Sequence, residues 1–198
     1  MINNKSDLKD YIKVEREKLS VSKNVIKHFF KVLWGNEQDV IFEFQKRLRI
    51  VEYHKNMHHR IRYLFEMCRL NRMRNKYGLL IHPNVFGKGL KIMHLGCILT
   101  NPMAKVGENC SIHINTAIVA GGVNDKVPIL GNDIVIGVGA TVLGGVTIAD
   151  GIAIGAGAVV NKSFMESDIS IAGVPARKIS DHGKKAWEER EVSINANS

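Results

Sequence analysis

The chain has 198 residues, of which 45% are hydrophobic, and its 28 basic and 19 acidic residues give a net charge of +9. This length allows one domain with an appendage and enough apolar material for a core. No stretch approaches 18 consecutive apolar residues, and the polar start MINNKSDLKDY lacks the apolar segment of an export signal. Three cysteines without metal-ligand spacing, Cys68, Cys97 and Cys110, favour a reducing compartment, so we expect a cytoplasmic protein.

Residues 1–77 are expected to form an α-helical region. Ser6 can cap the first helix, and Gly35 is a typical helix stop at the end of the second. No proline precedes Pro83, which favours uninterrupted helices. The pattern predicts three of them, over 7–19, 22–34 and 37–76.

The segment from Lys46 to Lys76 is strongly basic. It carries ten lysines and arginines against two glutamates, a net charge of +8. A basic face can bind nucleic acid, lipid headgroups or a phosphorylated molecule. No nucleic-acid motif accompanies it. We therefore favour a solvated helical face over a nucleic-acid partner, and membrane contact is the less favoured alternative.

A period of six organises residues 100–170. Nine of the eleven residues at every sixth position are Val, Leu or Ile: Thr100, Val106, Ile112, Ile118, Asn124, Leu130, Ile136, Val142, Ile148, Ile154 and Val160. Helices repeat at 3.6 residues and strands at 2.0, so neither explains this pattern. A solenoid of short strands does, and three six-residue sides would close a triangular coil of eighteen residues. The fold class is therefore mainly β.

These repeats resemble those of the hexapeptide-repeat acyltransferases. The similarity lies in LGNDIVIGVGATVLGGVTIADGIAIGAGAVV and in the exit motif IAGVPARKI, and it covers about residues 79–179. It implies a left-handed parallel β-helix, usually trimeric, that uses acetyl-CoA and needs no metal. We divide the chain into a helical region (1–77), a β-helix (78–179) and a C-terminal tail (180–198), in which a short helix can begin at Lys184 and run to about Val192.

The resemblance also names two candidate catalytic residues. The segment IMHLGCIL resembles the part of serine acetyltransferases that carries their catalytic base, which corresponds to His94. The segment IHINTAIV resembles a histidine segment of related O-acetyltransferases of polysaccharide biosynthesis and contributes His113. The two histidines are nineteen residues apart, about one coil, so they are expected to lie at one corner on adjacent coils. A neutral imidazole can take the proton of a hydroxyl while that hydroxyl attacks a thioester.

Departures from the serine enzymes bear on the acceptor. Met93 stands where an aspartate precedes their base, and Val127 stands where a histidine helps to bind the serine carboxylate. Their long helical domain is also not recognisable in the N-terminal region. These differences favour a sugar hydroxyl, as in surface-polysaccharide synthesis, with L-serine as the alternative. By the resemblance we expect Asn115, Asp125 and Lys126 to contact the acceptor.

Coenzyme A is expected in a groove between neighbouring subunits of a homotrimer. Small residues would let the pantetheine arm approach the backbone, and cations would bind the phosphates. The candidates are Gly139, Ala140, Ala156, Gly157 and Ala158 for the first role, and Lys162, Arg177 and Lys178 for the second.

Other interpretations remain open. A repeat scaffold without catalytic activity, or a metal protein using His82, His94 and His113, would share the same repeats. A catalytic cysteine at Cys97, three residues from His94, is less favoured than a packing role.

Overall fold

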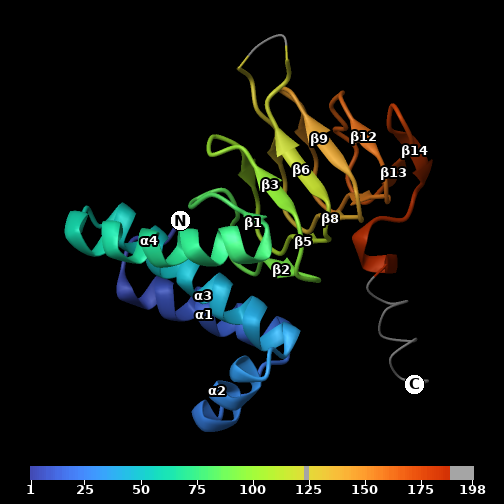
Figure 1. The fold of residues 1–198 in the computed structure, drawn as a ribbon. Coiled ribbons are helices and arrows are strands. Elements are labelled where there is room, and N and C mark those ends of the chain that lie inside the picture. The colour runs from blue at the N-terminus through green and yellow to red at the C-terminus, as the bar shows by residue number, and fades with distance from the viewer. Residues whose placement is uncertain (123–124, 188–198) are drawn as a thin grey trace, which may run out of the picture.

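The computed structural model describes residues 1–122 and 125–187, which form a helical region followed by a stack of short strands (Figure 1). A helical turn over 184–187 ends the described part, so the rest of the predicted helix to Val192 lies outside it. Four α-helices precede the strands within the described residues: α1 (Lys5–Lys18), α2 (Val25–Leu33), α3 (Glu37–Asn56) and α4 (Arg60–Tyr77).

The predicted helix over 37–76 is interrupted. The chain turns at 57–59, where His58 adopts a positive φ of 55°, and α4 then packs back against α3. This turn buries Leu48 and Leu70 in one core. Asn4 rather than Ser6 caps α1, since its side chain accepts a hydrogen bond from the Asp7 amide.

Three sheets of mostly parallel strands form the sides of the β-helix. Sheet A contains β1 (Leu79–Leu80), β3 (Ile98–Thr100), β6 (Thr116–Val119), β9 (Thr141–Leu143) and β12 (Val159–Val160). Sheet B contains β4 (Lys105–Val106), β7 (Ile129–Leu130) and β10 (Thr147–Ile148). Sheet C contains β2 (Lys91–Ile92), β5 (Ser111–Ile112), β8 (Val135–Ile136), β11 (Ala153–Ile154), β13 (Ser170–Ala172) and the antiparallel β14 (Arg177–Ser180).

The residues that recur every six positions form the interior of this β-helix, as predicted. Ile136 pairs with Ile154 eighteen residues later, and both are buried. Apart from Asn124, which lies outside the described residues, every residue of the sixfold series is buried. The fold is a left-handed parallel β-helix preceded by helices. Stacking is what buries its apolar side chains, because one coil alone has nothing to cover them.

Glycine is required at position 137, where two neighbouring coils approach closely. A Cβ atom built on Gly137 would lie 2.7 Å from the Ala156 nitrogen and 2.9 Å from the Gly155 carbonyl carbon. Both atoms belong to the main chain of the next coil and cannot move aside independently. The small residue at this position therefore fixes the spacing of two coils.

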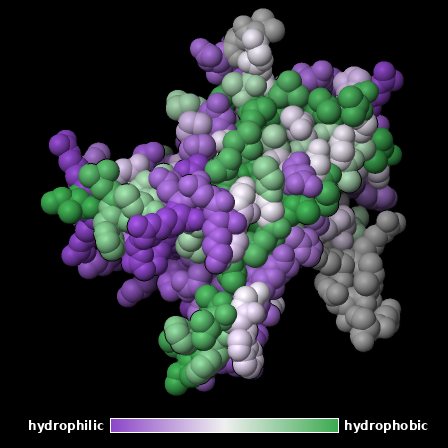
Figure 2. All heavy atoms as spheres, in the orientation of Figure 1, coloured by the Kyte–Doolittle hydropathy of each residue, from purple (hydrophilic) through white to green (hydrophobic). Residues whose placement is uncertain are grey.

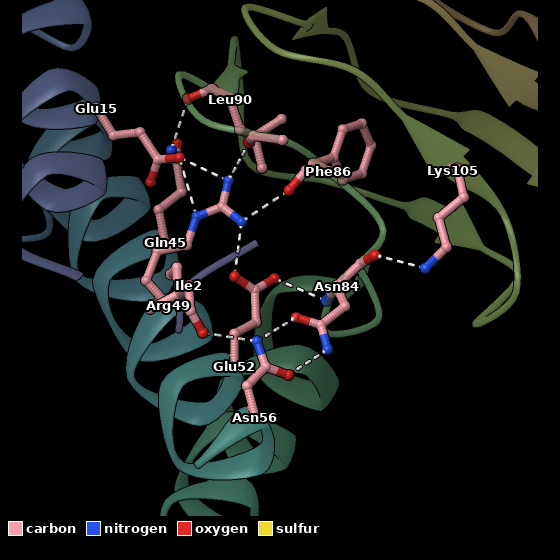
Figure 3. Close-up of polar contacts among 11 residues, drawn as sticks. Ile2, Glu15, Gln45, Arg49, Glu52, Asn56, Asn84, Phe86, Leu90 and Lys105 are labelled. Atoms are coloured by element: carbon pink, nitrogen blue, oxygen red, sulfur yellow. Dashed lines mark hydrogen bonds and ion pairs between the residues drawn. The ribbon is translucent and has the colours of Figure 1, made fainter. Parts of the chain in front are cut away.

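Arg49 of α3 joins the helical region to the first coil (Figure 3). It is fully buried, and its five N–H groups make five contacts. Two go to Glu15 (3.0 and 2.6 Å), one to Glu52 (2.8 Å), and two to the carbonyls of Phe86 (3.0 Å) and Gly87 (2.8 Å). Burial by itself would lower the pKa of Arg49, but the Glu15 and Glu52 carboxylates raise it above its ordinary value. The guanidinium therefore stays charged and fully hydrogen bonded beneath the β-helix.

Helix α2 turns its polar face inward and its apolar face outward. His28 is buried and contacts Asp39 at 2.6 Å and Glu43 at 2.9 Å, both on α3. The exposed side is apolar, as Figure 2 shows at the lower edge of the molecule, and consists of Val25, Ile26, Phe29, Phe30, Leu33 and Trp34. None of the described helices combines the length and apolarity that crossing a membrane requires.

Candidate functional site

The turns that connect sheet C to sheet A stack above one another and form what we call the histidine corner: residues 93–97, 113–115, 137–140 and 155–158. Main-chain hydrogen bonds hold them in register, for example from the His113 amide to the Ile136 carbonyl at 3.0 Å. The rings of His94 and His113 lie on adjacent coils with centroids 6.5 Å apart. The predicted proximity of the two histidines is therefore observed.

Glu37, the first residue of α3, contacts His94 from the helical region. Its Oε2 lies 3.1 Å from His94 Nδ1, and its Oε1 accepts a hydrogen bond of 2.9 Å from the Leu95 amide. The Leu95 amide and the His94 ring together outweigh the small effect of burial and hold the pKa of Glu37 below its ordinary value. Nothing in the sequence pattern points to Glu37, which is fifty-seven residues from His94.

A pocket of about 550 Å³ borders His113. Its floor is sheet C and the histidine corner, and its wall is the C-terminal segment that folds back along the β-helix. Trp187 forms part of that wall and meets the His113 ring edge to face at a centroid distance of 5.8 Å. Other lining residues are Val138, Ala156, Ile171, Ile179 and His182. The pocket is mainly apolar, with an imidazole at one end.

The predicted acceptor residues do not all gather at this corner. Asn115 lies in it, and its main-chain N–H donates to the Cys97 carbonyl at 2.6 Å. Asp125 and Lys126 lie in the connection from β6 to β7, between sheets A and B, and thus at a different corner of the same chain. Val127 is partly buried and packs against the core.

The small residues expected to bind coenzyme A continue the histidine corner over the next two coils. Ala156 is exposed and lines the pocket, and Gly139 and Gly157 are also exposed. Ala140 and Ala158 are fully buried, so their side chains fill the interior of the β-helix.

The cations predicted to bind phosphate are more dispersed. Arg177 is exposed on β14, whereas Lys178 forms ion pairs with Glu166 (2.5 Å) and Asp181 (2.6 Å). Lys162 lies over the Phe164 ring at 5.3 Å and borders a separate hollow with Gly121 and Gly144.

The histidines and cysteines of the alternative interpretations lie in different surroundings. His82 is held by the Thr100 carbonyl at 2.7 Å and by Arg74 at 3.2 Å. In the part of the chain that the structure describes, no group of three or more His, Cys, Asp or Glu residues is arranged to hold a metal ion. Cys97, the candidate for a catalytic cysteine, is exposed, so the packing role favoured for it is not observed. Burial raises the pKa of the Cys110 thiol to about 12, so Cys110 is a packing residue.

Comparison with known proteins finds sequence and structural similarity to serine acetyltransferases. The chain is 35% identical over 105 residues to a serine acetyltransferase of Synechococcus elongatus, a match that covers 52% of this chain and 43% of that protein. It is 28% identical over 178 residues to a serine acetyltransferase of Bacillus pumilus, covering 79% and 80%. A solved serine acetyltransferase of Brucella abortus in complex with coenzyme A shares the fold with a TM-score of 0.67 and 24% identity, over 89% of this chain and 67% of that one. No family model matches.

The fold therefore defines the class: a β-helix protein of the kind built from hexapeptide repeats. Within that class the relatives described above are serine acetyltransferases, and the chain spans less than half the length of the first curated relatives. The expected closer similarity to polysaccharide O-acetyltransferases is not shown by these matches.

Proposed function

We propose that this chain is an acetyl-CoA-dependent O-acetyltransferase that works at the histidine corner. The observation that carries the proposal is the stacking of His94 and His113 on adjacent coils, beside a mainly apolar pocket that runs along the small residues of the same corner. An apolar pocket that ends at the His113 imidazole suits a pantetheine arm whose thioester must come close to the neighbouring His94. The sequence similarity to serine acetyltransferases supports the same chemistry.

In the proposed reaction His94 is the base. Its Nδ1 is engaged by Glu37, so Nε2 is the nitrogen that takes the acceptor's hydroxyl proton. The hydroxyl oxygen attacks the thioester carbonyl, and the C–O bond forms as the carbonyl electrons move onto oxygen. Collapse of this intermediate breaks the C–S bond, and the thiolate of coenzyme A recovers the proton from the imidazolium. No covalent enzyme intermediate is needed.

L-serine is the acceptor that the named relatives favour. A sugar hydroxyl is a second candidate, because Val127 packs against the core where the serine enzymes place a histidine for the substrate carboxylate. An acceptor without a carboxylate would not need that histidine.

We further propose that the site is completed by a second copy of the chain, in a homotrimer. Asp125 and Lys126 lie at a different corner from His94, so they can reach the same acceptor only across a subunit boundary. Mixing two inactive variants, His94→Ala and Lys126→Ala, should then restore part of the activity, because some interfaces combine two intact halves. Absence of any restoration in mixed trimers would contradict a shared site.

The decisive experiment follows thiol release from acetyl-CoA with L-serine, free sugars and nucleotide sugars. Release with one acceptor, lost in His94→Ala, would establish the activity and the acceptor class together. An absence of both acetyl-CoA binding and turnover across the panel would overturn the proposal.

A further inference from the structure

The start of α3 contacts three consecutive residues of the first histidine-corner turn. Glu37 binds the Leu95 amide at 2.9 Å and His94 Nδ1 at 3.1 Å, while the Gln38 side-chain amide lies 3.5 Å from the Met93 carbonyl. The helical region therefore reaches the main chain on both sides of His94 as well as its ring. A helix that merely packed against the coil would not need a carboxylate directed at the imidazole.

We propose that Glu37 is the positioning residue of the base: its carboxylate holds the proton of His94 on Nδ1 and leaves Nε2 unprotonated to receive the acceptor's proton. This inference rests on the proposed function. In this role Glu37 takes the place of the aspartate that precedes the base in serine acetyltransferases, where this chain has Met93. The carboxylate comes from the helical region, not from the repeats.

The local structure suits a fixed anion. Glu37 is the first residue of α3, where the unpaired N–H groups and the helix dipole favour negative charge. The Asn36 side chain caps the same helix by accepting from the Asp39 amide at 3.3 Å, so the start of the helix is held in place. The Leu95 amide fixes one carboxylate oxygen and directs the other toward the ring.

Stability does not account for the pair. The side chains of His94 and Glu37 are 56% and 41% exposed, and exposed ion pairs contribute little to folding. To orient an imidazole, the carboxylate needs only to bind one ring nitrogen. A carboxylate can do this in a solvent-accessible pair as well as in a buried one.

Glu37→Gln tests the proposal with little change in shape. The Gln carbonyl can still accept from Leu95, but its NH₂ group would donate to Nδ1 and move the ring proton to Nε2, the nitrogen that must be free. We expect kcat to fall about 10²-fold, within the usual contribution of a general base, while KM for acetyl-CoA stays within about twofold. Glu37→Asp keeps the charge on a shorter arm and should recover part of kcat.

Glu43→Gln is the matched control. Glu43 lies on the same helix and also contacts a histidine, His28 Nε2 at 2.9 Å, away from the histidine corner. Its substitution should leave kcat within about twofold. If Glu37→Gln lowers kcat no more than Glu43→Gln does, the positioning role is overturned.

A second readout does not depend on turnover. The ¹⁵N chemical shifts of histidine rings distinguish the two neutral tautomers, with His94→Ala used to assign the His94 signals. The intact protein should show His94 protonated on Nδ1, and Glu37→Gln should show it protonated on Nε2. An unchanged tautomer overturns the inference even if kcat falls. Failure of acetyl transfer in the intact protein would instead overturn the proposed function, and the spectra would still decide the role of Glu37.

Discussion

The interior of the β-helix and its polar junction with the helical region are stabilised in different ways. The β-helix buries a continuous column of Val, Leu and Ile and turns at small residues, so each coil repeats the interactions of the previous one. The helical region joins it through a fully buried arginine, and α2 even buries a histidine and exposes its apolar face. Repeated apolar stacking tolerates gradual change, whereas a buried charged junction depends on single atoms. Four substitutions test this contrast, from the largest expected effect to the smallest.

Arg49→Ala should destabilise the protein most. It would leave Glu15 and Glu52 as buried carboxylates without their cation, and breaking a buried ion pair in this way costs about 3–5 kcal/mol. Urea unfolding followed by circular dichroism would measure the loss. Lys46→Ala is the control, because Lys46 forms a partly exposed pair with Glu43 and should cost about 1 kcal/mol or less. Equal losses for the two variants would contradict the special role of the junction.

Gly137→Ala should cost about 1–3 kcal/mol, the usual penalty for overpacking a close-packed site. The added Cβ would meet the main chain of the next coil, which cannot shift without disturbing the stack. Gly122 provides the comparison, since a Cβ there would have nothing within 4 Å, and Gly122→Ala should stay within about 0.5 kcal/mol. A lower urea midpoint for Gly137→Ala alone is the expected result, and similar midpoints for both would refute the steric argument.

His82 should make stability depend on pH at the boundary of the two regions. Burial, and then the charge of Arg74, hold the pKa of His82 below its ordinary value of 6.5. The unfolded chain therefore binds this proton at a higher pH than the folded chain, so stability is lost as the pH falls below about 6.5. Urea midpoints at pH 7, 6 and 5 should decline more steeply in the intact protein than in His82→Gln. Parallel slopes would show that His82 is not the group responsible.

Phe29→Ala on the exposed face of α2 should change stability least, by less than about 0.5 kcal/mol, because the ring is 62% exposed. The measurement is a urea midpoint at several protein concentrations. A larger loss that grows with dilution would mean that another molecule covers this face in solution.

The sequence predicted the β-helix well because its information is local. A period of six requires only neighbouring residues, and it correctly assigned Ile112, Ile136 and Ile154 to the interior. Counting residues around a coil was enough to bring His94 and His113 together. The resemblance to acyltransferases also led to the turns that border the pocket.

Contacts between the two regions could not be predicted in the same way. Glu37 contacts His94 because α3 packs on the first coil. The periodicity of a sequence does not indicate how two separate elements pack together. The break at His58 occurs without proline or glycine, because packing of α4 on α3 outweighs the local helical preference. Trp187 contacts His113 from a polar C-terminal segment. This segment contains no repeat, so its position on the β-helix could not be predicted from the sequence.

The contact between Glu37 and His94 also has an evolutionary meaning. The two residues of this contact are encoded by different parts of the gene, His94 by the repeat array and Glu37 by the helical region that precedes it. Recombination at the start of the first coil would therefore give the same imidazole a new partner.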